Sequence, residues 1–412
     1  MNESDRNPVT VNPMGRRTFL AGTAAAATMT VLKPSLVSGT KANAKVTLGM
    51  IGCGGRGAWI ANLFQQDGEY QIAAAADYFE DRARGVAGKF NVPADRVFTG
   101  LKCHEKLIEK GKLDAVAVIS PPFFRPEQVQ MAVKAGLHVY AAKPLAVDVP
   151  GCTLIKKCGE EASKKGLVFL VDFQTRANEF YKEALKRVHE GALGTLAFCE
   201  ASYHGGRLGA QAPPGTEEAR LRNWVFDIKL SGDVIVEQFI HALDVMSWGM
   251  KHAPPVRCTG TGGRKVRVDV GDCWDYFTLT YEYADKVGVA FSGRQFDGHG
   301  EPEGIINKMF GSQGTLHTEY GGKVLIRGGE KVFYRGGTTG GIYQEGAQAN
   351  IRTFRELVGK KDVTNTTVET SVLSNMIAIM GRTAAYTGRT VTWDEVTKST
   401  EVYDPNLKGL KS

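Results

Sequence analysis

Two kinds of hydrophobic spacing alternate along the first third of the chain after residue 44. Apolar runs of strand length are followed by segments with helical spacing, and then by the next apolar run. We predict strands at residues 46–51, 71–76, 114–120 and 138–141, and helices at 58–66 and 126–135. This order is typical of a parallel, doubly wound sheet, so we expect an α/β dinucleotide-binding domain over residues 45–165.

The pattern changes near Gly166. Longer, partly alternating runs separated by glycine-rich turns predict strands at 275–283, 287–292 and 323–327, and helical spacing returns at 349–357 and 371–386. Partial alternation indicates strands with one buried face, as in antiparallel sheets. We expect a second, α+β domain with a mostly antiparallel sheet over residues 166–396, and a C-terminal tail over 397–412.

The first 44 residues have the layout of an export signal. The pair Arg16-Arg17 precedes a weakly apolar stretch at residues 21–32, and the segment ends in the small-residue pattern Ala42-Asn43-Ala44. Paired arginines before such a stretch resemble the twin-arginine signal. We expect cleavage after Ala44, the twin-arginine machinery as a partner, and a periplasmic or otherwise exported location. A disordered tail with a chance arginine pair is the alternative.

Composition narrows the classes of partner. Hydrophobic residues make up 42% of the chain and charged residues 23%, as in soluble globular proteins. The formal net charge of +7 comes without a basic cluster in the body of the chain, so we expect no nucleic acid as partner. No apolar run there is long enough to span a bilayer, so we expect no membrane insertion. Seven scattered cysteines without a Cys-x-x-Cys pair argue against a disulfide framework or structural zinc.

A glycine-rich run joins the first predicted strand to the first predicted helix: Gly52-Cys53-Gly54-Gly55-Arg56-Gly57. Its spacing, G-x-G-x-x-G, permits a tight turn, the approach of a pyrophosphate and close packing of helix on strand. Asp77 ends the next strand, where a carboxylate can bind the ribose hydroxyls of a dinucleotide. We therefore expect NAD as cofactor, with NADP open because Arg82 and Arg84 stand nearby. A glycine-rich turn without a ligand is the alternative.

Lys143 follows the strand predicted at residues 138–141, and Pro144 favours extended backbone at this lysine. Ligands of open α/β sheets bind beyond the carboxyl ends of the strands. Lys143 could therefore reach the nicotinamide side of the pocket, or it could be a solvated surface lysine.

A polar stripe lies on an otherwise apolar helix predicted from residue 234 to 248, with Ser231 or Asp233 as its N-cap. Glu237, His241 and Asp244 are spaced i, i+4 and i+7, so they share one face. A histidine between two carboxylates can act as a tuned acid or base. An internal ion network is an equally open interpretation. A metal site is disfavoured because no further His or Cys cluster supplies the missing ligands.

Four motifs resemble the glucose–fructose oxidoreductase/inositol dehydrogenase family (Gfo/Idh/MocA) across residues 45–396. They are the glycine run, Ser120-Pro121-Pro122, residues 136–145 and residues 231–244. The resemblance implies a Rossmann domain joined to an α/β domain with an open, mostly antiparallel sheet. That sheet often forms the family's subunit interface, so the resemblance also implies a homo-oligomer, either a dimer or a tetramer.

The resemblance implies roles for individual residues as well. The lysine of the family's Glu-Lys-Pro motif maps onto Lys143, and its Asp-x-x-x-His-x-x-Asp pattern maps onto residues 237–244. We expect three catalytic residues: Lys143, His241 and Glu237. We expect substrate contacts from Asp244, Asn178, Arg176 and Trp224. Independently of the resemblance, Trp224 could stack on a sugar ring, and simple packing within the fold is the alternative for this aromatic side chain. Cofactor contacts are expected from the glycine run and from four further residues: Asp77, Ser120, Pro121 and Lys143. We expect no metal.

Four positions depart from the family's usual pattern. Ala142 stands where glutamate is usual, and Arg125 lies near a usual histidine. Glu237 replaces an aspartate, and Phe239 occupies a common glycine position. Loss of an anionic neighbour at position 142 would lower the pKa of the adjacent lysine.

Together these features predict an NAD(P)-dependent enzyme. It would transfer a hydride between a secondary hydroxyl of a sugar, glycoside or polyol and a tightly bound nicotinamide cofactor. His241 would take the hydroxyl proton while Lys143 hydrogen-bonds the same oxygen. Redox-neutral cleavage of a glycoside through a transient keto-sugar is one alternative. A non-catalytic, cofactor-bearing sugar-binding protein is the other.

Overall fold

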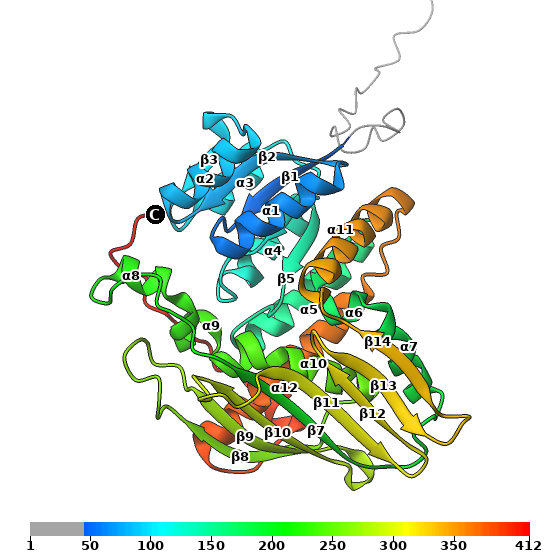
Figure 1. The fold of residues 1–412 in the computed structure, drawn as a ribbon. Helices are drawn as coiled ribbons and strands as arrows, with labels where there is room; N and C mark the ends of the chain where they lie inside the picture. The colour runs from blue at the N-terminus through cyan, green and yellow to red at the C-terminus, as the bar shows by residue number, and fades with distance from the viewer. Residues whose placement is uncertain (1–44) are drawn as a thin grey trace, which may run out of the picture. The chain divides into compact units, whose positions relative to one another are not determined.

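Six parallel strands form the first sheet of the computed structural model, which describes residues 45–412 (Figure 1). The predicted export signal and its cleavage point at Ala44 lie outside these residues. The strand order is β3-β2-β1-β4-β5-β6. The bounds are β1 Val46–Ile51, β2 Tyr70–Asp77, β3 Val97–Thr99, β4 Ala115–Val118, β5 His138–Ala142 and β6 Phe169–Asp172. The order reverses direction between β1 and β4, the point beyond which doubly wound sheets bind ligands.

Helices cover both faces of this sheet, which is why its strands are almost wholly apolar. On one face pack α1 (Gly55–Asp67) and α2 (Glu80–Phe90). On the other pack α3 (Cys103–Lys110), α4 (Arg125–Lys134) and α5 (Val149–Lys164). Successive strand residues enter opposite cores, as Met50 and Ile51 do. The predicted doubly wound fold is confirmed.

The predicted boundary at residue 165 is too early by one strand. β6 pairs in parallel with β5, so the first sheet continues to Asp172. A helix from the C-terminal half, α11 (Ile342–Lys360), also packs on the face covered by α1, and the Tyr70 hydroxyl donates to the Ile351 carbonyl at 2.9 Å. Helical spacing shows that a segment is amphipathic but does not show which sheet it covers. The first domain is therefore not continuous in sequence.

Nine strands form the second sheet, in the order β14-β13-β12-β11-β7-β10-β9-β8-β15. The bounds are β7 Leu196–Gly205, β8 Arg257–Gly263, β9 Tyr276–Glu282, β10 Gly288–Gln295, β11 Gly304–Gly311, β12 Gly314–Glu319, β13 Lys323–Gly328, β14 Tyr334–Thr338 and β15 Val391–Thr392. The pair β7–β10 is parallel and the other pairs are antiparallel. The prediction of a mostly antiparallel second sheet is confirmed.

Three helices pack on one face of the second sheet: α7 (Glu179–His189), α10 (Ile240–Gly249) and α12 (Thr366–Thr387) (Figure 1). The opposite face stays open, as the alternation in β9 shows: Phe277 and Leu279 are buried, and Thr278 between them is exposed. On the strands β7 and β11, Phe198 and Phe310 stack at 4.5 Å between ring centroids, and Phe198 is 46% exposed. Within residues 45–412, the structure contains no helix both long and apolar enough to cross a bilayer.

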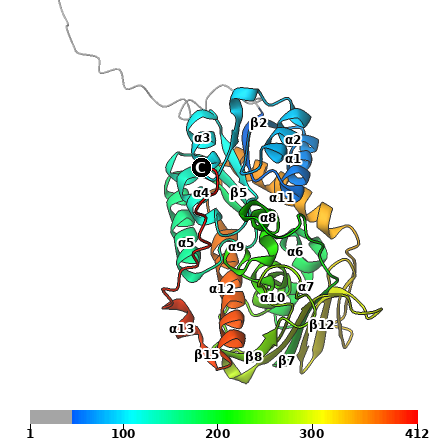
Figure 2. The ribbon, with the colours of Figure 1, turned by 90° about the vertical axis from the view of Figure 1, so that its left-hand side faces the viewer.

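The last residues run back along the first domain. After α13 (Trp393–Thr397), residues 398–412 form an extended segment that passes the α4–α5 side and reaches the loop after β3 (Figure 2). The Leu101 amide donates to the Lys411 carbonyl at 2.9 Å. Two leucines of the segment, Leu407 and Leu410, pack against the apolar cluster that contains Phe79, which follows β2. We call residues 398–412 the C-terminal strap.

Candidate functional site

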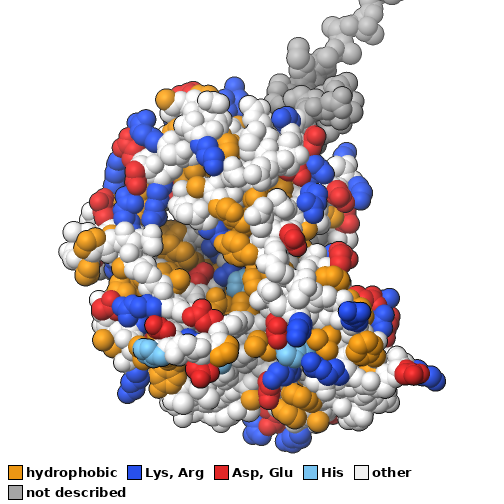
Figure 3. Space-filling model, in the orientation of Figure 1, with side chains coloured by type: hydrophobic (Ala, Val, Ile, Leu, Met, Phe, Trp, Pro, Cys, Tyr) orange, Lys and Arg blue, Asp and Glu red, His pale blue; other side chains and the backbone are white. Residues whose placement is uncertain are grey.

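A cavity of about 360 Å³ lies beyond the carboxyl ends of β1, β2 and β4. This volume lies within the usual range for small-molecule and cofactor sites. The glycine run and Asp77 line one wall, and Ser120 and Pro121 line another. Trp224, from a short 3₁₀ turn of the second domain, closes a third side. Figure 3 shows a hollow in the surface of the molecule, with basic, acidic and His side chains inside it.

The glycine run has the geometry of a phosphate-binding turn. Gly52 has φ +90°, and a Cβ built there would lie 2.5 Å from the Ser120 amide nitrogen. A Cβ on Gly57 would lie 1.8 Å from the Gly52 carbonyl oxygen, so only glycine lets α1 approach β1 this closely. The N-cap of α1, Gly54, has no side chain to bond the first helical amides, which therefore remain available for a pyrophosphate. These residues fit a dinucleotide.

Asp77, the last residue of β2, lines the cavity. Its carboxylate accepts hydrogen bonds from the Cys53 amide (2.7 Å) and the Phe79 amide (2.9 Å), which fix its orientation. Burial raises the pKa of Asp77, although these amides favour the ionised form. Of the two arginines that left NADP open, Arg82 stacks over the Phe79 ring beside the cavity, whereas Arg84 pairs with Glu80 on the surface of α2.

Lys143 and Glu237 meet across the two domains. The Lys143 Nζ donates to the Glu237 carbonyl at 2.5 Å and lies 3.3 Å from the Glu237 Oε1. The two side chains are only 13% and 15% exposed. Burial lowers the pKa of Lys143, and Glu237 partly opposes this effect by stabilising the ammonium. The first predicted catalytic pair is thus brought together.

A π-helical segment changes the register of the predicted polar stripe. The helix begins after Asp233, whose carboxylate accepts from the adjacent Val234 amide at 2.6 Å, but no side chain makes a capping hydrogen bond to the first turn. The segment η4 (Ile235–Phe239) is π-helical and leads into α10. Such segments occur frequently at functional sites because they shift side chains relative to a regular helix. The Glu237 carbonyl that accepts from Lys143 belongs to this segment.

His241 is the second residue of α10, and its imidazole lies within the electrostatic influence of Lys143. Burial, followed by the charges of Lys143 and Arg56, lowers the pKa of His241 well below its usual value. Its ring packs near Phe173 (6.0 Å between centroids) and Tyr320 (5.8 Å). Among the residues that the structure describes, its buried Nδ1 has no hydrogen-bond partner. A neutral imidazole next to a lysine amine can accept a proton from a bound hydroxyl.

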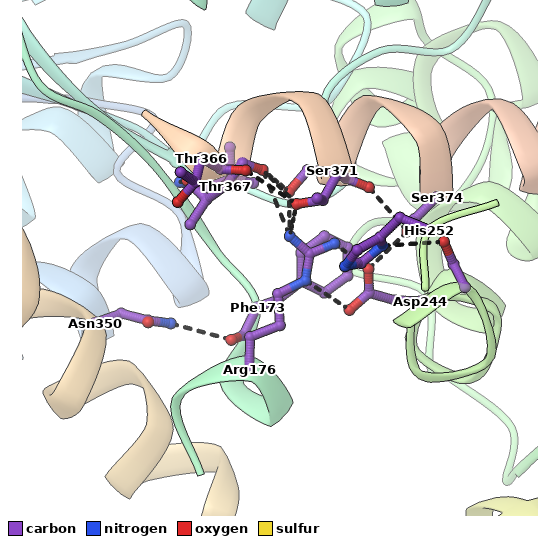
Figure 4. A network of polar contacts seen from close by, with 12 residues as sticks. Phe173, Arg176, Asp244, His252, Asn350, Thr366, Thr367, Ser371 and Ser374 are labelled. Atoms are coloured by element: carbon purple, nitrogen blue, oxygen red, sulfur yellow. Dashed lines mark hydrogen bonds and ion pairs between the residues drawn. The ribbon is translucent and has the colours of Figure 1, made fainter. Parts of the chain in front are cut away.

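The third residue of the stripe, Asp244, forms an ion pair with Arg176 (Figure 4). The Arg176 Nη2 lies 2.5 Å from the Asp244 Oδ1, and the Nε donates to Oδ2 at 3.1 Å. The Ser374 hydroxyl donates to the Oδ1 at 2.7 Å, and the aspartate side chain is fully buried. Two residues predicted to bind substrate therefore bind each other, and their contact with substrate stays a prediction.

The other two predicted substrate contacts also have neighbours of their own. The Asn178 side chain caps α7 by accepting from the Phe180 and Tyr181 amides. Trp224 lines the cofactor cavity. Their roles toward substrate stay predictions as well.

Sequence reasoning missed one residue of this region, Asp172. It ends β6, and its Oδ2 lies 2.6 Å from the Arg56 Nη2, so an arginine of the glycine run is anchored on the last strand of the sheet. Asn350 of α11 donates to the other oxygen at 2.8 Å. The signal was present, because a carboxylate at the end of a parallel strand is placed like Asp77. Asp172 was not considered as a residue of this site because the predicted first domain ended at residue 165.

Comparison with known proteins agrees with this geometry. A family model described as an oxidoreductase family with an NAD-binding Rossmann fold (GFO/IDH/MocA) matches residues 46–173. The model of the GFO/IDH/MocA C-terminal domain matches residues 181–317. The first match includes β6, as the structure does.

Individual relatives are distant. A myo-inositol dehydrogenase, Hyg17, of Streptomyces leeuwenhoekii is 25% identical over 71% of this chain and 82% of its own length. A glycosyl hydrolase family 109 protein of Solibacter usitatus is 29% identical over 40% of this chain and 38% of its own length. The structure of GenD2 from gentamicin A biosynthesis, in complex with NAD, covers 85% of this chain and 96% of its own, with 17% identity and a TM-score of 0.67.

Proposed function

Because the chain belongs to the GFO/IDH/MocA family of NAD-binding oxidoreductases, we propose that it transfers a hydride between NAD and a secondary hydroxyl of a sugar, glycoside or polyol. One observation carries the proposal. Lys143 and Glu237 are in contact at the sheet edge that also carries the glycine run, and the charges of Lys143 and of Arg56 from that run act on His241. The similarity to a myo-inositol dehydrogenase supports a polyhydroxylated substrate.

Each of these side chains has a distinct task in oxidation of a carbinol. His241, neutral because of its lowered pKa, takes the hydroxyl proton on an imidazole nitrogen. The Lys143 Nζ donates to the same oxygen, and Glu237 holds this Nζ in place. The bound nicotinamide supplies the hydride acceptor. The products are a ketone, a reduced cofactor and a proton on His241.

We also propose export with a retained cofactor, and assembly into a homo-oligomer. The arginine pair and the apolar stretch before Ala44 support export. The C-terminal strap supports retention, because it bonds Leu101 and packs beside Phe79, and both residues line the cofactor cavity. The open face of the second sheet, with the exposed Phe198–Phe310 stack, supports an interface between copies.

The proposal is tested by native mass spectrometry followed by a substrate panel. The purified full chain is examined for bound NAD, and is then mixed with inositols, aldoses and glycosides while reduced cofactor is followed by its fluorescence. We expect bound dinucleotide and reduction by at least one polyol or sugar. Purified protein that binds no dinucleotide, with or without added NAD, would contradict the proposal.

Variants connect any turnover to the assigned residues. Lys143→Met removes the donor and is expected to lower turnover about 100-fold or more, the scale of one lost oxyanion donor. Lys165→Met is the matched control, because Lys165 also bonds a carbonyl (Val133, 3.1 Å) and a carboxylate (Glu161, 2.8 Å), but away from the cavity. Equal turnover in the two variants would exclude a role for Lys143 in the reaction.

A second candidate function is redox-neutral cleavage of a glycoside, which the similarity to the glycosyl hydrolase family 109 protein favours. Transient oxidation to a ketone acidifies the neighbouring C–H and permits elimination of the glycosidic oxygen. Incubation with aryl glycosides distinguishes the two functions. Release of the phenol without net cofactor reduction indicates cleavage, and reduction without release indicates the simple dehydrogenase.

A further inference from the structure

Arg125 is a buried cation whose hydrogen-bond partners are all carbonyl oxygens. It is the first residue of α4 and is 3% exposed. Its Nε donates to the Ser120 carbonyl at 2.7 Å, and its Nη1 donates to the carbonyls of Ala142 (2.9 Å) and Pro144. Ser120 lies in the loop after β4, Ala142 is the last residue of β5 and Pro144 lies in the loop that follows, so all three acceptors lie at the same edge of the sheet.

This arrangement is costly. Burial lowers the pKa of Arg125 to about 9, which records how poorly the site tolerates the charge. The N-terminus of α4 adds an unfavourable positive dipole beside the guanidinium. The charge of Glu237 partly opposes the effect of burial, and the hydrogen bonds of the guanidinium all go to backbone carbonyls rather than to a carboxylate.

The positions of the three carbonyls indicate which parts of the site the buried guanidinium holds in place. Ala142 and Pro144 are the two neighbours of Lys143 in the chain, so the guanidinium fixes the backbone on both sides of this lysine. Ser120 precedes Pro121, and both line the cofactor cavity. The Arg125 side chain therefore fixes the position of Lys143 relative to the cavity wall.

Two departures from the family's usual pattern meet at this point. Ala142 stands where glutamate is usual and Arg125 lies near a usual histidine, and in the structure the arginine bonds the Ala142 carbonyl directly. The alanine leaves no acidic side chain beside the lysine in the chain, and Glu237 of the other domain is the carboxylate that contacts the Nζ.

We propose that Arg125 is a positioning residue that holds Lys143 against Glu237 and toward the reacting oxygen, an inference that rests on the role of Lys143 in the proposed function. Its effect is on geometry, because its Nε and Nη1 are bonded to the carbonyls on either side of Lys143 and at the cavity wall. Displacement of a reacting group by 1 Å costs about 100-fold in rate. Loss of Arg125 should therefore lower turnover without an equal loss of cofactor affinity.

The test compares Arg125→Met with Arg267→Met. Arg267 is also a buried arginine (1% exposed), and it donates to the carbonyls of three residues in the segment between β8 and β9: Val270, Cys273 and Trp274. Both variants lose a buried guanidinium and leave carbonyls unbonded, so similar destabilisation is expected. Arg125→Lys serves as a milder change if Arg125→Met does not fold, because a lysine cannot bond both loops at once.

Crystal structures of the variants with NAD, and turnover of the most active polyol from the panel, are the two measurements. We expect the Lys143 Nζ to leave the Glu237 carbonyl in Arg125→Met, turnover to fall about 100-fold, and the Kd for NAD to stay within about threefold. Arg267→Met should keep the Nζ in place and turnover within about threefold. The double variant Arg125→His/Ala142→Glu, which restores the family's pair, should regain at least tenfold over Arg125→Met.

An undisplaced Nζ in Arg125→Met, or equal turnover in Arg125→Met and Arg267→Met, would overturn the positioning role. The crystallographic measurement does not need a substrate. If no polyol is oxidised by the wild-type chain, the proposed function fails, whereas the place of the Nζ in the variant still decides what Arg125 does.

Discussion

Removal of the Asp244 carboxylate is expected to destabilise the protein by about 3–5 kcal/mol, the cost of breaking a buried ion pair from one side. In Asp244→Ala the Arg176 guanidinium, 13% exposed, would lose both of its bonds to the aspartate, at 2.5 and 3.1 Å. The full range applies because the carboxylate is completely buried and so has no bulk water to replace it. This prediction separates an internal ion pair from a direct substrate contact.

The double variant Arg176→Met/Asp244→Leu is expected to recover most of that loss. Replacing a buried pair by apolar side chains of similar size is often neutral or stabilising, because both desolvation penalties disappear. The hydroxyls that contact the pair keep partners within their own helix, since Ser371 donates to the Thr367 carbonyl and Ser374 to the Thr370 carbonyl. We expect the double variant to lie within about 2 kcal/mol of the wild type.

Urea unfolding, followed by tryptophan fluorescence and circular dichroism, measures these differences. The exposed pair Lys182–Glu179 is the control, and Glu179→Ala should cost less than about 1 kcal/mol. A loss below about 1 kcal/mol in Asp244→Ala, or a double variant as unstable as the single one, would refute the reasoning. Asp244 would then be free to meet the substrate, as the family pattern implies.

Three further predictions concern the cofactor site and the reaction. Gly57→Ala should abolish retention of NAD, because its Cβ would lie 1.8 Å from the Gly52 carbonyl; Gly88→Ala, a helical position with open space around it, should be neutral or stabilise by about 0.5–1 kcal/mol. Because the pKa of His241 is well below its usual value, kcat/KM should stay level as pH falls through about 6.5 and drop only in more acidic buffer. An acidic fall of kcat/KM with its midpoint near pH 6.5–7 would contradict the assignment of His241 as a strongly buried, neutral imidazole. Deletion of residues 401–412 should speed NADH release at least tenfold in a fluorescence chase, because the strap bonds Leu101 at the cavity wall; an unchanged rate would contradict retention by the strap.

The sequence predicted the features that depend on short-range geometry. The turn at Gly52 and the close approach at Gly57 exclude any side chain, so the glycine spacing marks them without knowledge of the rest of the fold. Asp77 and Lys143 follow apolar strands, and the carboxyl ends of parallel strands share one edge. Their location at the cavity edge followed from this rule alone.

Features that depend on distant partners were beyond the reach of spacing. The polar stripe of Glu237, His241 and Asp244 predicted one shared face, but the π-helical segment and the pairing of Asp244 with Arg176 divide these residues between two environments. Whether a carboxylate faces a cavity or a buried cation depends on which helix packs beside it. The role of Arg125 likewise depends on two loops that meet only in the folded chain.

The packing of α11 on the first sheet has a consequence for the order in which the protein is made. The face that α11 covers includes the buried rings of Phe64 and Tyr140, and Phe354 of the helix contacts the second of these. A nascent chain that ends before residue 342 therefore presents this face to water. The hydrophobic core of the dinucleotide domain, although this domain is encoded first, is therefore complete only once α11 has been synthesised.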